Sequence, residues 1–177
     1  MMKTRKIILL GYMGSGKTAV GKQLKEKLDV PFWDLDGYIE QKFNSTISSI
    51  FKLRGEMYFR EEERQALEDL LETDNRMIIS LGGGTPCYYD NMEYLISSEN
   101  VKTFYLHADV ETISKRLELE KDKRPLISHL KNIDEINDFV GKHLFERKEF
   151  YTKADFMIYT KKKSVKNIAL ELEKLLT

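Results

Sequence analysis

A short segment near the start of the chain has the composition of a loop that holds phosphate groups. Residues 11–18 read Gly-Tyr-Met-Gly-Ser-Gly-Lys-Thr, which fits the pattern of a glycine, four residues and then Gly-Lys-Ser or Gly-Lys-Thr. Glycines let backbone N–H groups turn toward a phosphate without Cβ clashes, and the positive end of a following helix adds to the attraction. The lysine reaches the β- and γ-phosphates, and the next hydroxyl is a ligand for Mg²⁺. The pattern therefore predicts that Lys17 and Thr18 bind a nucleoside triphosphate with its metal.

The flanking residues favour this interpretation over a plain glycine turn without a ligand. Ile7–Leu10 is an apolar run typical of a buried strand, and Val20, Leu24 and Leu28 recur at the spacing of one helix face. A strand, a glycine loop and a helix in that order form the setting in which the motif binds phosphate. A turn would explain the glycines, but not the Lys-Thr pair at its fixed offset.

Two acidic residues, Asp34 and Asp36, lie at the end of the second apolar run, Val30–Leu35. Residues two apart in a strand point to the same face, so both carboxylates are expected on one side of a crevice. The alternative is a helix cap plus one solvated acid, because aspartate caps helices well. A magnesium-nucleotide site needs an acidic partner at a strand end, and the run Met77–Leu81 ends without one. Asp34 is therefore the predicted metal partner.

Two further segments suit a polar, anionic ligand. Arg60 is expected in the first turn of a helix, where a cation opposes the helix dipole, and Glu63 can hold its guanidinium. The same two residues could instead form a surface ion pair worth under about 1 kcal/mol. Gly82, Gly83 and Gly84 suit the close approach of a ligand to bare backbone, although a flexible turn would also accept them.

A basic segment at residues 121–138 is predicted to be a mobile lid. It begins Lys-Asp-Lys-Arg-Pro-Leu, and such a segment beside a nucleotide site can close over it and exclude water. Taken alone, it would be a solvated run of charges. Arg147 and the run Lys161–Lys163 cannot be told from surface residues by themselves, and the three histidines show no metal-ligand spacing.

Strand and helix patterns alternate along the chain. Strands are expected at Ile7–Leu10, Val30–Leu35, Met77–Leu81, Thr103–Leu106 and Phe156–Tyr159. Helices are expected at Lys17–Leu28, Gly37–Phe43, Ser48–Leu53, Glu56–Glu72, Met92–Ser97, Val110–Glu120, Ile133–Tyr151 and Ser164–Leu176. The alternation predicts one α/β domain over residues 1–177, with a parallel sheet covered on both faces. Ligands of such sheets bind at the carboxyl ends of the strands.

Composition excludes several other classes of protein. The 177 residues include 29 Lys plus Arg and 29 Asp plus Glu, so no basic field is available to hold nucleic acid or an anionic membrane. Cys87 is the single cysteine, which precludes an intrachain disulfide and favours a reducing compartment. No apolar run approaches the roughly 20 residues needed to span a bilayer. We expect a cytoplasmic protein with neither nucleic-acid nor membrane partners.

The combination of motifs resembles the shikimate kinase family along nearly the whole chain. That family joins its phosphate loop to Asp-x-Asp, Gly-Glu-x-x-Phe-Arg-x-x-Glu, Gly-Gly-Gly, an Arg-Pro-Leu lid and a later Arg before a Tyr. The corresponding segments here are Gly11–Thr18, Asp34–Asp36, Gly55–Glu63, Gly82–Gly84, Arg124–Leu126 and Arg147 with Tyr151. The phosphate loop alone is shared by very many nucleotide enzymes, whereas the combination is far more specific.

The resemblance implies ATP-dependent phosphorylation of the 3-hydroxyl of shikimate, a step toward chorismate and the aromatic amino acids. It also implies a three-layer P-loop domain with a five-stranded parallel sheet of order 2-3-1-4-5 and a mobile lid, as in nucleoside monophosphate kinases. ATP and Mg²⁺ are the implied cofactors, shikimate and ATP are the implied small-molecule partners, and we expect a monomer.

By position, the resemblance assigns residues to the nucleotide, the metal and the acceptor. Nucleotide contacts are implied for Gly11, Gly14, Ser15, Gly16, Lys17, Thr18, Ala19, Arg116 and Arg124, with Arg116 on the adenine. Metal contacts are implied for Thr18 and Asp34. Acceptor contacts are implied for Asp36, Arg60, Gly82, Gly83, Gly84 and Arg147. The first two belong to a shikimate-binding segment at about 36–63. Lys17, Asp36 and Arg124 are the implied catalytic residues, and no adenine-binding pattern is recognisable at 161–166.

Three other functions agree less well with the sequence. Another small-metabolite kinase of the same fold, such as a gluconate-kinase-like enzyme, would not need both Arg60 and Arg147 for a carboxylate. A GTPase-like switch would need an Asn-Lys-x-Asp guanine signature, which the sequence lacks. A non-catalytic regulatory binder is disfavoured, because the phosphate-loop lysine and threonine and both aspartates are present.

Overall fold

Five parallel strands form a sheet of order β2-β3-β1-β4-β5, which confirms the expected order. The structure is a computed structural model that describes residues 5–121, 124 and 126–176. The strands are β1 (Lys6–Leu10), β2 (Phe32–Asp34), β3 (Met77–Ser80), β4 (Val101–His107) and β5 (Phe156–Tyr159). The central strand β1 pairs in parallel with β3 on one side and β4 on the other.

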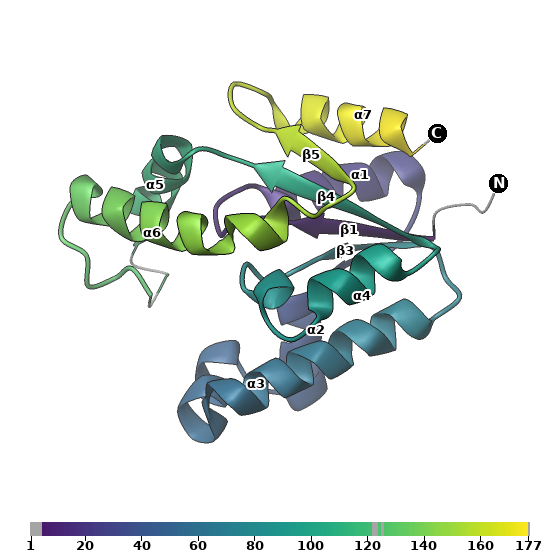
Figure 1. Cartoon of the computed structure of the whole chain (residues 1–177), viewed down its shortest axis with the longest axis horizontal. Helices are drawn as coiled ribbons and strands as arrows, with labels where there is room; N and C mark the ends of the chain where they lie inside the picture. The colour runs from purple at the N-terminus through teal and green to yellow at the C-terminus, as the bar shows by residue number, and fades with distance from the viewer. Residues whose placement is uncertain (1–4, 122–123, 125, 177) are drawn as a thin grey trace.

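Helices cover both faces of this sheet (Figure 1). One face carries α1 (Lys17–Leu28) and α7 (Val165–Leu175), which pack against each other. The opposite face carries α2 (Leu35–Phe43), α3 (Ile47–Glu72) and α4 (Asn91–Ser97). A second packed pair, α5 (Val110–Leu119) and α6 (Ile133–Tyr151), lies toward the carboxyl ends of β4 and β5. The phosphate loop leaves β1 at this same end.

The apolar character of β1 follows from its burial on both faces. Ile7 and Leu9 belong to the core beneath α1 and α7, whereas Ile8 and Leu10 belong to the core on the other face. A strand with a core on each side has no solvated face, so it is a continuous apolar run rather than an alternating one. Among the described residues, no helix is both long enough and apolar enough to cross a membrane.

The two helices expected at Ser48–Leu53 and Glu56–Glu72 are joined into α3, which is interrupted at Gly55. This residue has φ 84° and ψ 171°, a conformation that is essentially restricted to glycine. The second half of α3 starts at Glu56, so Arg60 lies in its second turn. The expectation that Arg60 occupies the first turn was therefore wrong, and the effect of the helix dipole on it is correspondingly small.

The segment expected to be a lid is partly built into the core. Ile127 and Leu130 are buried on the same side of the sheet as α5 and α6. Helix α6 begins at Ile133, so the last residues of the expected 121–138 segment are helical. Asp122, Lys123 and Pro125 of that expectation lie outside the described residues.

The contact between α1 and β2 leads to a prediction about stability. A Cβ on Gly21 would lie 2.2 Å from Cε2 of Phe32, so the Gly21→Ala variant must displace a ring at the sheet. We expect the free energy of unfolding to fall by about 1–3 kcal/mol, measured by urea denaturation. Gly141→Ala in α6 is the matched control, because a Cβ there meets no atom of the described residues within 4 Å. The control should gain stability of up to about 1 kcal/mol, and equal losses in both variants would contradict the steric argument.

Candidate active site

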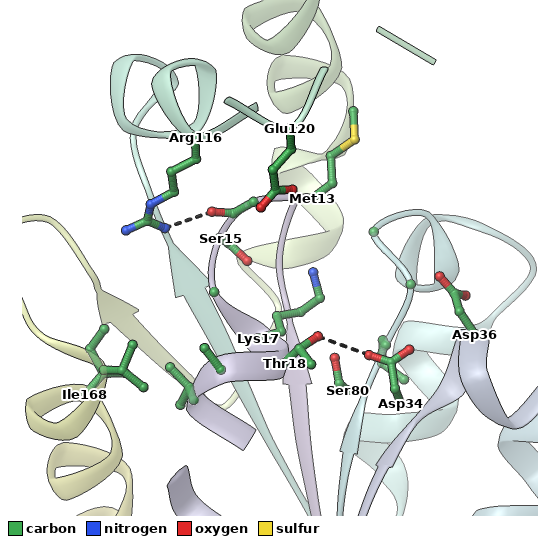
Figure 2. Close-up of a pocket in the computed structure, with 18 of the residues that line it drawn as sticks. Met13, Ser15, Lys17, Thr18, Asp34, Asp36, Ser80, Arg116, Glu120 and Ile168 are labelled. Atoms are coloured by element: carbon green, nitrogen blue, oxygen red, sulfur yellow. Dashed lines mark hydrogen bonds between the residues drawn. The ribbon is translucent and has the colours of Figure 1, made fainter. Parts of the chain in front are cut away.

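A cavity of about 520 Å³ opens at the carboxyl ends of the central strands, where ligands of parallel sheets bind. One wall is the loop after β1 together with the start of α1, and a second wall comes from the ends of β2 and β3. Figure 2 shows Lys17 and Thr18 in the middle, with Asp34 and Asp36 on one side and Arg116 and Ile168 on the other. The cavity thus extends from the predicted phosphate loop in two directions.

The loop at 11–18 has the conformation that its glycines were expected to permit. Gly11, Gly14 and Gly16 all have positive φ values, at 143°, 78° and 100°. The hydroxyl of Ser15 is buried and has no hydrogen-bond partner among the residues that the structure describes. Within this part of the chain, no side chain caps the N-terminus of α1 either. An uncapped helix start beside an unpaired buried hydroxyl fits a phosphate group well.

Lys17 is held inside this loop. Its Nζ donates hydrogen bonds to the carbonyl oxygens of Gly11, at 2.8 Å, and Tyr12, at 3.1 Å. Burial lowers the pKa of Lys17 to about 8, although the charges of Asp36 and Asp34 act in the opposite direction. A phosphate beside this ammonium would favour its charged form for the same electrostatic reason.

Thr18 and Asp34 contact each other directly. The Thr18 hydroxyl donates to Oδ2 of Asp34 over 3.1 Å, and Oδ1 of Asp34 accepts from the backbone N–H of Gly37 at the start of α2. A hydroxyl next to a carboxylate is the kind of hard oxygen pair that Mg²⁺ prefers. Within the described part of the chain, no three His, Cys, Asp or Glu side chains gather into a metal cluster. This donor set fits an ion that also takes ligands from phosphate and water.

Asp36 reaches the site from a helix and not from a strand, so the alternation argument for it was wrong. Strand β2 ends at Asp34, the chain enters α2 at Leu35 without an intervening turn, and Asp34 itself is the N-cap. Asp36 still lines the same cavity as Asp34. Burial raises its pKa to about 6, with a further contribution from Glu63 and opposition from Lys17.

The glycine segment 82–84 lies between the remaining predicted residues. A Cβ on the first glycine would lie 3.0 Å from Oδ1 of Asp36, and one on the second would lie 3.4 Å from Nη1 of Arg147. A Cβ on the third would lie 2.9 Å from Nη2 of Arg60. The second glycine also lies beside the backbone N of Met13 in the phosphate loop. The segment therefore connects the phosphate loop with one carboxylate and two guanidinium groups.

Arg60 forms a largely buried ion pair, so the surface-pair interpretation was wrong. Its Nη1 donates to Oε2 of Glu63 over 3.0 Å, and the Glu63 side chain is only 1% exposed. Oε1 of Glu63 accepts a second hydrogen bond, of 2.6 Å, from the hydroxyl of Thr85, which directly follows the glycines. The guanidinium is thereby fixed relative to the glycine segment.

Arg147 projects from α6 on the other side of the glycines. Its guanidinium lies over the ring of Tyr12, with 5.3 Å between Cζ and the ring centroid. One turn later, the hydroxyl of Tyr151 donates to the carbonyl oxygen of Gly83 over 2.5 Å. These contacts join α6 to both the phosphate loop and the glycine segment.

The far end of the cavity contains two arginines that the family resemblance implied and three residues that the sequence did not single out. Arg116 and Arg124 both line the cavity: Nη1 of Arg116 donates to the carbonyl oxygen of Gly14 over 2.8 Å, and Arg124 pairs with Glu120. Three residues around the start of α7 were missed: Lys163, Val165 and Ile168 also line the cavity. The sequence offered one signal for these residues, which is the apolar Val165 at the start of a helix after a basic loop. In the structure its side chain is 39% exposed.

Comparison with protein families gives a match over residues 13–177 to the model of the family described as shikimate kinase. A shikimate kinase of Flavobacterium psychrophilum is 42% identical over 172 residues, which cover 97% of this chain and 99% of the relative. A shikimate kinase of Bacteroides thetaiotaomicron is 44% identical over 152 residues, which cover 86% of this chain and 85% of the relative.

Solved structures agree with this likeness. The crystal structure of a shikimate kinase from Bacteroides thetaiotaomicron superposes with a TM-score of 0.88 at 39% identity and covers 97% of both chains. A shikimate kinase from Acinetobacter baumannii in complex with shikimate has a TM-score of 0.84 at 31% identity, covering 99% of this chain and 94% of that one.

Proposed function

This chain belongs to the shikimate kinase family, and from that premise we propose how its residues transfer the γ-phosphoryl group of ATP to the 3-hydroxyl of shikimate. The reaction yields shikimate 3-phosphate and ADP, a step toward chorismate and the aromatic amino acids. The observation that carries the residue assignments is the position of the glycine segment 82–84. It lies against the phosphate loop, Asp36, Arg60 and Arg147 at once.

In the donor half of the proposed site, the phosphate loop holds the triphosphate. The loop residues Gly11, Gly14, Ser15, Gly16 and Ala19 surround the phosphates, and Lys17 supplies the positive charge. Thr18 and Asp34 hold Mg²⁺, directly or through water; when bound, this ion neutralises charge on the β- and γ-phosphates. Support comes from the unpaired Ser15 hydroxyl and from the 3.1 Å contact between Thr18 and Asp34.

In the acceptor half, the two arginines bind the carboxylate of shikimate. A guanidinium offers a planar fork of donors that matches a carboxylate, and Arg60 and Arg147 lie on either side of the glycine segment. The glycines leave room for the ring. Asp36 contacts the accepting hydroxyl and takes its proton, for which a carboxylate with a pKa of about 6 is suited near neutral pH.

Positioning and charge stabilisation provide most of the catalysis in phosphoryl transfer, which needs little covalent chemistry from the protein. We assign the adenine to the far end of the cavity, beside Arg116, and Arg124 to the transferring phosphate. Residues 36–63 then act as the shikimate-binding segment of a single, monomeric kinase domain. The lid is the segment that begins at residue 121 and includes Arg124, and Ile127, Leu130 and the start of α6 anchor it to the core.

An ADP-release assay with a panel of acceptors tests this function. Shikimate, gluconate and nucleoside monophosphates are supplied in turn with ATP, with Mg²⁺ or with a chelator. We expect turnover with shikimate that depends on the metal. Turnover with another acceptor alone would indicate a different small-metabolite kinase, and shikimate binding without turnover would indicate a regulatory binder.

The Arg60→Ala variant should separate acceptor binding from donor binding. Loss of a charge-assisted, bidentate contact is expected to raise the KM for shikimate by about 10- to 100-fold while the affinity for ATP stays nearly unchanged. Steady-state kinetics and nucleotide titration measure the two quantities. Arg54→Ala, which removes an exposed arginine from the first half of α3, is the matched control. A fall in ATP affinity instead would place Arg60 on the phosphates.

A further inference from the structure

The guanidinium of Arg60 has a second set of contacts besides its ion pair with Glu63. Its Cζ lies 3.9 Å from the ring centroid of Tyr88, which indicates a stacked cation–π contact. Its Nη2 also donates to Oε1 of Glu56 over 3.3 Å. The rings of Phe59 and Phe51 lie farther from Cζ, at 5.1 and 5.9 Å. Arg60 is thus held along two edges by carboxylates, and Tyr88 is its nearest aromatic ring.

Tyr88 participates in this arrangement twice. Its ring lies against the guanidinium, and its hydroxyl donates to Oε1 of Glu56 over 2.6 Å, the same oxygen that Nη2 of Arg60 contacts. Glu56 is half exposed, so without this hydrogen bond its side chain has solvent-facing alternatives. Tyr88 therefore restrains both the plane of the guanidinium and the counter-ion on its Nη2 edge.

The position of Tyr88 in the chain connects it to the glycine segment. It directly follows a single 3₁₀ turn, Thr85–Cys87, that begins immediately after Gly84. A Cβ on Gly84 would lie within 3.2 Å of three guanidinium atoms of Arg60, so that position cannot carry a supporting side chain. The aromatic support is instead supplied by Tyr88, on the far side of the turn.

We propose that Tyr88 is a positioning residue for the acceptor: its ring holds the Arg60 guanidinium in the orientation that receives a carboxylate. Tyr88 contacts Arg60 and is not required to touch the substrate. The inference rests on the proposed function, because it assigns Arg60 to the carboxylate of shikimate. The affinity for shikimate then depends mainly on the aromatic face of Tyr88, and to a lesser degree on its phenolic hydroxyl.

Replacement of the ring tests the proposal by separating KM from kcat. In Tyr88→Leu the KM for shikimate is expected to rise about five- to tenfold, since a partly buried cation–π contact is worth roughly one factor of ten in affinity. The kcat should stay within about twofold and the KM for ATP should be unchanged. Tyr88→Phe keeps the ring and should rescue the KM to within about twofold of the unmodified protein.

A neutral acceptor distinguishes positioning from general packing. The methyl ester of shikimate lacks the charge that Arg60 binds, so Tyr88→Leu should leave kcat/KM for the ester nearly unchanged. A merely structural role would lower kcat/KM for the acid and the ester alike. Equal losses for the two acceptors, or an unchanged KM for shikimate in Tyr88→Leu, would overturn the proposal.

The chain offers a matched control in a second stacked pair of the same helix. Cζ of Arg64 lies 4.3 Å from the ring centroid of Tyr94, but Arg64 pairs with Glu68 and Asp90, whereas Arg60 lies against Gly84. Tyr94→Leu should leave the KM for shikimate unchanged, and a rise equal to that of Tyr88→Leu would overturn the proposal.

One further measurement and one further variant keep the outcome unambiguous. An unchanged affinity for ATP shows that the donor loop of the variant is intact. If Tyr88→Leu does not fold, Tyr88→Met replaces it, because methionine has a volume similar to that of leucine and also lacks an aromatic face. The methionine variant should show the same rise in KM, and an unchanged KM there overturns the proposal. If the unmodified protein fails to phosphorylate shikimate, the proposed function fails instead.

Discussion

Replacing Lys17 by alanine is expected to abolish measurable turnover, with kcat falling by roughly 10³-fold or more. The physical reason is that, in the proposed site, a single ammonium serves both the loop and the phosphates. Lys17 donates to the carbonyl oxygens of Gly11 and Tyr12, and its charge is directed into a largely buried site where electrostatic effects are strong. Alanine removes the charge and both hydrogen bonds.

The measurement is single-turnover phosphoryl transfer at saturating ATP and shikimate, which separates chemistry from binding. Lys22→Ala, on the exposed face of the same helix, is the matched control and should behave like the unmodified protein. An unchanged kcat in Lys17→Ala would remove this residue from the mechanism. Calorimetric titration with ATP should show weaker binding in the variant.

Asp36→Asn is expected to lower kcat by about 10²- to 10⁴-fold, the usual effect of removing a general base. The amide keeps the shape of the side chain but cannot take a proton, so nucleotide affinity should change far less than kcat. Comparison of the Kd for ATP with kcat checks this. Equal effects on both quantities would indicate that Asp36 acts only in the structure of α2.

The pH dependence supplies an independent test of the same residue. Burial raises the pKa of Asp36 to about 6, so its base form is lost as the pH falls through that value. Burial lowers the pKa of Lys17 to about 8, so its charge is lost as the pH rises through that value. At saturating ATP, kcat/KM for shikimate should therefore fall on the acidic side near pH 6, and the basic limb should lie above pH 8, because bound phosphate favours the charged form of Lys17. In Asp36→Asn the acidic limb should be absent, and its persistence would assign that limb to another group.

Much of the fold could be predicted because its signals are local. The buried run of β1, the glycine loop and the helix α1 are adjacent in the chain, and each has its own pattern. Parallel strands separated by helices follow from the alternation of these patterns, whereas the strand order came from the family resemblance. Both were confirmed.

The sequence predicted that Asp36 lies in the same cavity as Asp34, but not that it belongs to a helix, because the chain passes from β2 into α2 without a turn residue. A strand period and a helix start overlap at that point, and the tertiary position of α2 decides between them. The contacts of Tyr88 and the cavity residues of α7 depend on packing between distant segments, and such packing leaves no pattern in the local sequence. Ion-pair spacing did predict the contact of Arg60 with Glu63, although not its burial.

The three consecutive glycines also determine which kind of screen would detect a harmful mutation in this segment. The three atoms nearest to an added methyl group are all side-chain atoms: those of Asp36, Thr85 and Glu63 at Gly82, and the guanidinium of Arg60 at Gly84. We expect these side chains to shift before the backbone does, so that the reactive groups are displaced while the chain still folds. Screens for expression or thermal stability would pass these variants, and only a screen for activity would reject them. Glycine at these positions preserves the arrangement of functional groups rather than the fold itself.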